Sequence, residues 1–405
     1  MVPNGWSNTC IDDNITFSGG AQPPREVFKF EPEEGYIRLI QIRDYKSDKF
    51  ITYVPKKLAK KFCTADDVMI GRYGPPIFQI LRGIEGAYNV ALIKAIPKSG
   101  VDKEFMYYFL KRDPLLKVIE SFSQRTSGQT GIEMDVLKAY PMHLPPLPEQ
   151  RKIAQILSTW DRGIATTEKL IDASKQQKKA LMQQLLTGKK RLIDPETGEA
   201  FEGDWEEVKL GDVLTKISNG LTYDSKATQG LPVSRIETIS TGKVNHAKVG
   251  YAPNDEKTIK FKLQFGDILY SHINSLEHIG RVAYFLDDKD LYHGMNLLLL
   301  RASKDADSKF IYFMLSSSLG KEFARSHAKS AVNQASISTT DLKGFKAKLP
   351  GLGEQQKIAS VLTAADKEIE LLQAKLAHFK DEKKALMQQL LTGKRRVKVE
   401  DVQAA

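Results

Sequence analysis

The sequence predicts an α+β chain built as a tandem of two similar halves. The segment 149–191 returns without a gap at 354–396, and KKALMQQLLTGK is identical in both copies. Apolar residues in both segments recur with alternating four-and-three spacing, which is typical of long helices that pair. The remaining sequence mixes short alternating runs with helical runs. We therefore expect two mixed α/β domains separated by two long antiparallel coiled-coil helices, with an internal pseudo-two-fold.

The repeat fixes the expected domain boundaries, and the length of 405 residues fits two to three domains. The expected parts are a first domain at 1–148, a first long spacer helix at 149–191, a second domain at 192–353, a second spacer helix at 354–396 and a tail at 397–405. A simpler alternative is that each helix docks on its own domain. Pairing is favoured because two matching apolar stripes can bury each other, whereas a lone exposed stripe promotes aggregation.

The apolar stripe runs the whole length of each repeated segment. In the second copy its positions are Ile358, Leu362, Ala365, Ile369, Leu372, Leu376, Phe379, Lys383, Leu386 and Leu390, and in the first they are Ile153, Leu157, Trp160, Ile164, Thr167, Ile171, Ser174, Lys178, Leu181 and Leu185. Glu149 and Glu354 suit the positive end of a helix, and Gly188 and Gly393 are expected to stop it. About 39 residues would make a helix of roughly 58 Å.

The net charge of +10 is concentrated in the repeated segments, and the rest of the chain is nearly neutral. A DNA-binding surface on the domains would therefore depend on local clusters. Two are visible, and a solvated face explains each equally well: Lys56, Lys57, Lys60 and Lys61, and Lys257, Lys260 and Lys262. Cys10 and Cys63 are isolated, which predicts packing roles. No apolar run approaches ~18 residues and no leader is evident, so we expect no membrane association and a cytoplasmic protein.

Several polar segments carry side chains that can read base edges in the major groove. We expect strands at 36–43 and 232–239, helices at 103–116 and 309–323, and polar loops at 121–130 and 325–334. The candidate DNA contacts are Arg38, Gln41, Arg43, Lys46, Arg72, Gln124, Arg125, Thr126, Arg235, Glu237, Thr238, His272, Asn274, Lys329, Asn333 and Gln334. For each of these residues an ordinary surface role remains the alternative.

The sequence predicts neither a catalytic site nor a metal site. ThrGlyLys at 187, 241 and 392 is followed by Lys, Val and Arg, so no GxxxxGK[ST] phosphate loop is present. The run at 74–77, GlyProProIle, lacks the polar lead and the aromatic residue that amino-methyltransferases use. The seven histidines are dispersed. We therefore expect a protein that binds rather than catalyses.

At this point the chain resembles a known family. Trp6 and Trp205 open the two halves, LeuProProLeuProGluGlnArgLysIleAla occupies 144–154, and LeuLeuThrGlyLys closes each repeated segment. This arrangement resembles the DNA specificity subunit of type I restriction-modification enzymes, and the resemblance covers the whole chain. The second copy departs from it at Gly351 and Gly353, which replace two prolines and suggest a more pliable hinge.

The resemblance implies a division of labour. Each domain would be a target-recognition domain that reads one half of a bipartite, asymmetric site in double-stranded DNA. Two modification subunits would carry S-adenosylmethionine, and two restriction subunits would use ATP and magnesium, so this chain would itself hold no cofactor. Two other classes remain to be weighed: a non-catalytic coiled-coil adaptor that binds protein partners, and a stand-alone nuclease or methyltransferase, which the missing motifs disfavour.

Overall fold

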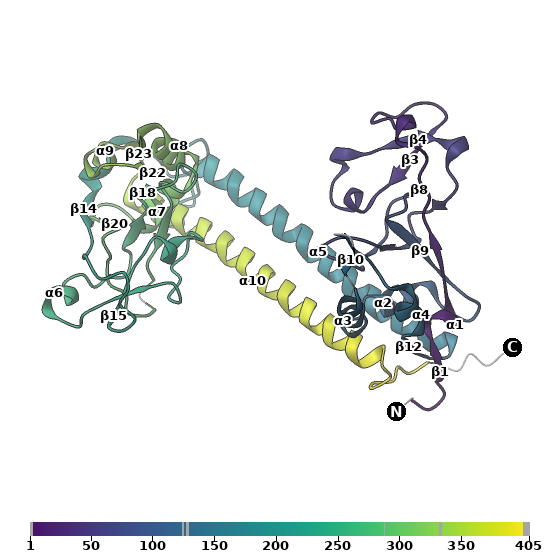
Figure 1. Cartoon of the computed structure of the whole chain (residues 1–405). Helices are drawn as coiled ribbons and strands as arrows, with labels where there is room; N and C mark the ends of the chain where they lie inside the picture. The colour runs from purple at the N-terminus through teal and green to yellow at the C-terminus, as the bar shows by residue number, and fades with distance from the viewer. Residues whose placement is uncertain (1–2, 124, 127–128, 287, 332–333, 400–405) are drawn as a thin grey trace. The chain divides into compact units, whose positions relative to one another are not determined.

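The chain forms two compact units. The computed structural model describes residues 3–123, 125–126, 129–286, 288–331 and 334–399. Unit 1 contains residues 1–168 and 375–405, and unit 2 contains residues 169–374. Each unit consists of a mixed domain and part of both long helices (Figure 1). The α+β class predicted from the sequence is confirmed.

A four-stranded antiparallel sheet lies at the centre of unit 1. Its order is β2 (Ile15–Gly19), β9 (Leu92–Pro97), β6 (Val68–Gly71) and β7 (Ile80–Leu81). All four residues of β6 are buried, as expected for an apolar strand between two neighbours. A separate pair, β1 (Ser7–Cys10) with β12 (Pro141–Leu144), brings the start of the domain to its end.

Short helices cover this sheet. They are α1 (Ile11–Asn14), α2 (Lys103–Leu110), α3 (Asp113–Phe122) and α4 (Met134–Ala139). The single helix expected at 103–116 is wrong, because Arg112 is extended and α3 begins after it with Pro114 in its first turn. Asp102 caps α2 by accepting a hydrogen bond from the Phe105 backbone N–H.

A smaller sheet is inserted between the strands of the central sheet in unit 1. Its order is β4 (Tyr53–Pro55), β3 (Tyr36–Ile40), β8 (Gly86–Tyr88) and β5 (Phe62–Cys63). Short 3-10 turns accompany it: η1 (Arg25–Val27), η2 (Ile42–Tyr45), η3 (Asp48–Phe50) and η4 (Lys56–Leu58). The strand expected at 36–43 therefore stops at Ile40, because Asp44 accepts a hydrogen bond from the Gln41 N–H and starts η2.

Unit 2 repeats the central plan of unit 1. Its four-stranded sheet has the order β14 (Leu214–Asn219), β20 (Leu298–Ala302), β17 (Ile268–Tyr270) and β19 (Val282–Tyr284). The accompanying elements are β13 (Glu206–Lys209) paired with β23 (Lys346–Leu349), η5 (Leu210–Val213), α7 (Ser308–Ser316), α8 (Ser318–His327) and α9 (Thr339–Lys343). The helix expected at 309–323 is also two helices, since Ser317 ends α7 and caps α8.

The inserted segments of unit 2 differ from those of unit 1. They contain β15 (Leu231–Val233) paired with β16 (Gly250–Ala252), η6 (Glu237–Ile239) and α6 (Glu256–Ile259). The strand expected at 232–239 is therefore confined to its first residues and is followed by η6. The two domains share a scaffold and differ in what is inserted into it.

A β-hairpin follows the second of the paired domain helices in each unit. In unit 1 it joins β10 (Arg125–Thr126) to β11 (Gln129–Thr130). In unit 2 it joins β21 (Lys329–Ala331) to β22 (Gln334–Ser336), and β22 also pairs with β18 (Ile273–Asn274). The segments expected to be irregular loops at 121–130 and 325–334 therefore contain paired strands.

The two long helices, α5 (Leu147–Leu185) and α10 (Leu352–Leu390), have 39 residues each, the expected length. Every expected stripe position is buried or half-buried. Both helices end three residues before a glycine with φ of +69°, Gly188 or Gly393, and the left-handed conformation of that residue terminates the helix.

Matching ion pairs hold the helices antiparallel within each unit. In unit 1 the Lys383 Nζ lies 2.5 Å from the Asp161 carboxylate, and the Trp160 and Phe379 rings meet edge to face at 5.4 Å. In unit 2 the Lys178 Nζ lies 2.5 Å from the Asp366 carboxylate. The two pairs are the same pair of repeat positions with the helices exchanged, and they explain why each apolar stripe contains one lysine.

The helix ends also dock on the domains. Ile153 and Leu157 of α5 and Leu390 of α10 join the apolar core of unit 1, and Leu185, Ile358 and Leu362 join that of unit 2. Pairing and docking therefore coexist, and each helix packs one end into the core of each unit rather than docking on its own domain alone.

A second ion pair repeats at the junction between helix end and domain. The Arg396 guanidinium binds the Glu149 carboxylate at 2.7 Å and donates to the Asn4 carbonyl at 2.7 Å in unit 1. In unit 2 Arg191 binds the Glu354 carboxylate at 2.8 Å and donates to the Gly203 carbonyl at 2.9 Å. The basic cluster after each helix thus has a structural partner.

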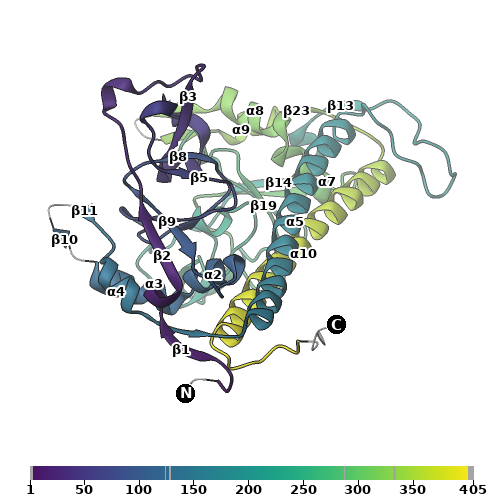
Figure 2. The same cartoon turned by 90° about the vertical axis from the view of Figure 1, so that its right-hand side faces the viewer.

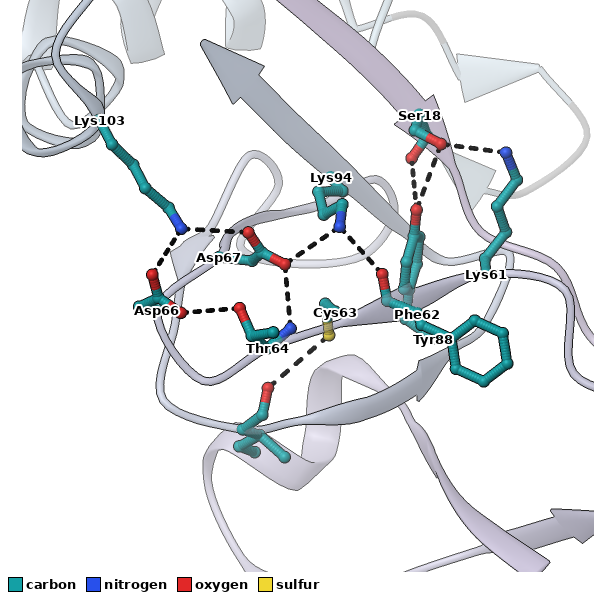
Figure 3. A network of polar contacts seen from close by, with 11 residues as sticks. Ser18, Lys61, Phe62, Cys63, Thr64, Asp66, Asp67, Tyr88, Lys94 and Lys103 are labelled. Carbon is teal, nitrogen blue, oxygen red and sulfur yellow. Dashed lines mark hydrogen bonds and ion pairs between the residues drawn. The ribbon is translucent and has the colours of Figure 1, made fainter. Parts of the chain in front are cut away.

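A polar network joins the two sheets of unit 1 (Figure 3). The Tyr88 hydroxyl of β8 donates to the Ser18 carbonyl of β2 at 3.3 Å, and the Lys94 ammonium of β9 donates to the Phe62 carbonyl of β5 at 3.0 Å. Lys94 also binds the Asp67 carboxylate at 3.0 Å, as does Lys103 at 3.1 Å. The small sheet is therefore tied to the central sheet by cations and carboxylates as well as by packing.

Asp267 directly precedes the central strand β17 of unit 2, as Asp67 precedes β6 in unit 1. Its carboxylate accepts a hydrogen bond from the Gln264 backbone N–H at 2.8 Å and two from the Arg301 guanidinium at 2.7 and 2.8 Å. Asp267 is only 1% exposed. Arg301 is therefore the counter-charge of a buried carboxylate.

His293 makes unit 2 sensitive to acid. Its Nε2 donates to the Leu297 carbonyl at 2.9 Å, and burial lowers the pKa of this histidine to about 4. The neutral form is favoured by folding, so the stabilisation is complete above pH 6.5 and is lost as the pH falls from 6.5 to about 4. We expect a loss of up to about 3 kcal/mol in the free energy of unfolding, measured by urea titration. His293→Gln should remove this part of the pH dependence; an unchanged profile would contradict the assignment.

Candidate nucleic-acid interface

The hairpin of each unit lies beside the residues that follow a central strand. In unit 2 the Ile337 N–H donates to the His272 carbonyl at 2.9 Å, and Asn274 pairs with Ala335. In unit 1 the Ile132 N–H donates to the Arg72 carbonyl at 3.2 Å. The same connection therefore builds the same small sheet twice. We call it the hairpin surface: β10, β11 and residues 72–73 in unit 1, and β18, β22 and β21 in unit 2.

Six of the predicted DNA contacts with a described position fall on the hairpin surfaces. Lys329 and Gln334 are exposed on β21 and β22, and the Asn274 amide donates to the Ser271 hydroxyl at 3.1 Å. Arg72 stacks on the Tyr73 ring at 5.2 Å. Arg125 and Thr126 form β10, although their side chains lie outside the described set, as do the predicted contacts Gln124 and Asn333. Sequence positions about 60 to 65 residues apart in each unit are thus brought together.

His272 supports this surface from inside. It is 8% exposed, burial lowers its pKa, and among the described residues its Nδ1 has no hydrogen-bond partner. A buried neutral imidazole is not presented to DNA. This burial disfavours the prediction that the His272 side chain contacts bases, and its backbone carbonyl holds the sheet.

A second basic surface lies on the inserted part of unit 1. Figures 1 and 2 show β3 at the end of the domain away from α2, α3 and α4. We define the distal basic surface as the exposed cations of η2, η3 and the residues between them, Arg43, Lys46 and Lys49; Lys56, Lys57 and Lys60 are also exposed, on η4 and the loop after it. The Arg43 and Lys49 cations each lie 5.3 Å from the centre of the Phe50 ring, which is 52% exposed. An exposed aromatic among cations suits a nucleic acid.

Arg43 and Lys46 of this surface were among the DNA contacts predicted from the sequence, whereas Phe50 and Lys49 were not. The signal was present, because Phe50 follows a polar run and is flanked by cations at Arg43, Lys46 and Lys49. The expected strand ended at Arg43, and no element was predicted for Lys49 and Phe50. The turn at η3 is what exposes Phe50.

Arg38 and Gln41 serve the interior of the same segment. The Arg38 Nη2 donates to Asp48 at 2.9 Å, and its Nε lies 3.8 Å from the carboxylate of Asp44, which is 4% exposed. Burial raises the pKa of Asp44. The Gln41 amide donates to the Thr52 hydroxyl at 3.0 Å. Both side chains therefore have structural partners that position η2 and η3, and both remain partly exposed, so their contact with bases stays a prediction.

Some predicted contacts on the insertion of unit 2 are partly exposed, and one is buried and has structural partners. Arg235 lies 3.5 Å from Glu237, and both are partly exposed. Thr238 is fully buried: its hydroxyl accepts from the Arg235 N–H at 2.9 Å and donates to the Lys248 carbonyl. Thr238 therefore has a structural role, and its burial disfavours the prediction that it contacts DNA. Lys257 and Lys260 are exposed beside α6, and Lys262 pairs with Asp290 at 2.7 Å.

The described residues contain no cluster of three histidine, cysteine or acidic side chains able to hold a metal ion. Across the same residues, no helix has the length and apolarity needed to cross a bilayer. The chemistry of both surfaces is that of exposed cations, amides and aromatic rings. Such groups contact phosphates and base edges.

Comparison with known proteins identifies the family. The family model for the type I restriction modification DNA specificity domain matches twice, at residues 3–176 and 202–380. The MjaVIII type I restriction enzyme specificity subunit of Methanocaldococcus jannaschii is 30% identical, with 98% of this chain and 94% of that protein covered. The EcoKI specificity subunit of Escherichia coli is 25% identical, over 88% of this chain and 81% of that protein. The MjaX specificity subunit, also of M. jannaschii, is 43% identical but matches only 49% of this chain and 47% of its own length.

Solved structures show the same fold. The type I restriction-modification S subunit from M. genitalium has a TM-score of 0.60 at 15% identity and covers 95% of this chain and 96% of its own. A structure from work on assembly and conformational transition of the type I R-M system also has a TM-score of 0.60, at 17% identity, over 98% of this chain and 100% of its own. With both domains matched by the family model, the chain belongs to the family of type I restriction-modification DNA specificity subunits.

Proposed function

We propose that the two domains read two different halves of one bipartite, asymmetric site in double-stranded DNA. The observation that carries this proposal is the repeated scaffold with divergent surfaces. The central sheets have equivalent strand order, and the hairpins are attached in the same way. The half-buried side chains beside the two hairpins differ, with Arg72 beside one and Asn274 beside the other. Different side chains beside equivalent hairpins suit two unlike half-sites.

The basic residues and the amides would have separate tasks. Lysines of the distal basic surface would neutralise phosphates and position the protein, a contribution that depends on salt. Asn274 and Gln334 can form the bidentate amide contacts that distinguish adenine in the major groove. The family membership favours this function over the protein-binding adaptor.

The long helices would recruit the partner subunits. Lys179 and Gln183 are exposed on α5, and the same residue types are exposed at the repeat positions Lys384 and Gln388 on α10. Internal packing does not require identical exposed side chains. Two copies of one partner would require them, which supports two modification subunits per chain. These would carry S-adenosylmethionine, and two restriction subunits would supply ATP- and magnesium-dependent cleavage, so this chain would itself hold no cofactor.

Methylation-site mapping tests the proposed function. A host expressing the chain with its modification subunit should acquire a split, asymmetric methylated adenine motif that the host lacking the chain does not show. A confirmed complex that produces no new motif would instead favour the adaptor function.

Gln334 offers a test of one half-site. Gln334→Ala should weaken discrimination at a single position of one half-site by roughly 1–3 kcal/mol and leave the other half-site unchanged. The measurement is competition between duplexes that differ by one base pair. Gln356→Ala, an exposed glutamine on α10, is the matched control. Equal weakening on all sequences would make Gln334 a phosphate contact.

A further inference from the structure

Unit 2 contains a cationic cavity that the predicted contacts do not include. It has a volume of about 380 Å³ and lies between α8 and the loop that joins β18 to β19. Three cations line it: Arg281 from the end of that loop, and Lys321 and Arg325 from α8. Lys321 and Arg325 are four residues apart and therefore share one face of the helix.

The loop is packed tightly onto α8 at Gly280. This glycine has φ of +75°, and a Cβ placed on it would lie 2.3 Å from the Cβ of Ala324, which is fully buried. The Gly280 N–H donates to the Ser271 carbonyl, and the Ser271 N–H donates to the Arg281 carbonyl, both at 2.8 Å. The absence of a side chain at Gly280 thus allows Arg281 to lie close to the helix. The cavity is a consequence of this fixed packing.

The positive charge in the cavity is not neutralised by the chain. The Arg281 guanidinium donates to the Ser240 carbonyl, and one of its nitrogens lies 3.0 Å from the Nδ1 of His278. These partners orient the guanidinium but carry no negative charge. Among the described residues, Lys321 and Arg325 form no ion pair, and Glu277 is the one carboxylate that lines the cavity. Three cations facing one carboxylate favour binding of an anion.

The cavity adjoins the hairpin surface of unit 2. The loop follows β18 directly, and α8 leads through Ala328 into β21. An anion in the cavity would therefore lie next to the elements that carry Asn274 and Lys329. A DNA backbone alongside those side chains would present a phosphate there.

We propose that this cavity binds one phosphodiester group of the DNA backbone and thereby positions the half-site read by unit 2. The inference rests on the proposed function. It also predicts an asymmetry between the domains, because the repeat positions of Lys321 and Arg325 in α3 are Leu116 and Glu120. Unit 1 has no equivalent pair of cations at these positions and would anchor its half-site through other residues.

The double variant Lys321→Gln with Arg325→Gln tests the phosphate site. Its affinity for a duplex carrying both half-sites is measured in complex with the modification subunit over a range of salt concentrations. Loss of one phosphate contact should reduce the slope of log K against log salt by about 1 and weaken binding several-fold at low salt. The preference among altered half-sites should remain unchanged, because a phosphate contact carries no base information.

A matched control removes two cations from unit 2 without touching the cavity. Lys304 and Lys343 are exposed and do not line it, so Lys304→Gln with Lys343→Gln changes the net charge equally. An equal change of slope in this control, or an unchanged slope in the cavity variant, would overturn the proposal. A change of base preference would make the residues base contacts, and weaker binding of the modification subunit alone would assign the anion to a protein. If the wild-type complex binds no specific duplex, the proposed function itself fails.

Discussion

Deleting seven residues from both long helices should abolish tight binding to the natural DNA site and create tight binding to a site with a shorter gap. Residues 165–171 and 370–376 are equivalent in the repeat and form one heptad of each stripe. Their removal shortens each helix by about 10 Å, the length of roughly three base pairs. Affinity for the natural site should fall toward the non-specific level, a factor of about 10³ or more. Binding to duplexes of graded gap length measures the shift.

The two ion pairs of the helices provide the control. Lys383 with Asp161 and Lys178 with Asp366 lie in one antiparallel register, one pair on each side of the deleted segments. Deletion from both helices keeps both pairs in register, whereas deletion from α5 alone displaces one pair by seven residues. The single deletion should therefore destabilise the chain without yielding a new preferred gap. Altered half-site sequences with an unchanged gap would contradict the role of the helices as spacers.

Arg301→Met should lower the free energy of unfolding by about 3 kcal/mol, because it leaves the buried Asp267 carboxylate without its bidentate partner. Asp267 also caps the turn before β17, so the uncompensated charge lies at the start of a central strand. Urea denaturation followed by circular dichroism measures the change. Arg301→Lys should be milder, since it keeps the charge and loses the paired geometry.

The double variant Arg301→Met with Asp267→Asn separates charge from packing. It removes both charged groups and should recover part of the stability lost in Arg301→Met alone. A loss below about 1 kcal/mol in the single variant would show that the carboxylate is solvated in solution.

The long helices were predictable because one physical signal governs them. A stripe with alternating four-and-three spacing requires a partner over its whole length, and every residue of the expected stripe is buried or half-buried. Even the lysines in the stripe followed the repeat. Their carboxylate partners, Asp161 and Asp366, lie outside the stripe pattern and became apparent only from the structure.

The candidate contacts were harder to predict because polarity does not reveal exposure. Thr238 and Arg235 are both polar and close in sequence, yet Thr238 closes a turn from inside while Arg235 is partly exposed. The alternating pattern predicts that Arg38 is exposed on its strand, but its side chain lies beside the buried carboxylate of Asp44, four residues after the strand ends at Ile40. Contacts between residues far apart in the sequence decide whether such a polar side chain is exposed, and they also build the hairpin surfaces. A local sequence pattern does not reveal these contacts.

The contacts of Arg191 and Arg396 have a consequence for how such chains can be rearranged. Arg191 reaches the Gly203 carbonyl across a short continuous segment, whereas Arg396 reaches the Asn4 carbonyl across 392 positions of sequence. Each arginine binds a glutamate at the start of a long helix and a backbone carbonyl near the start of a domain. Only Arg191 is joined to that carbonyl by a short peptide segment. Chain continuity between Arg191 and Gly203 is therefore not what holds that junction together. Recombination within this segment would exchange one domain for another. The contacts of Arg191 with Glu354 and the Gly203 carbonyl would be kept.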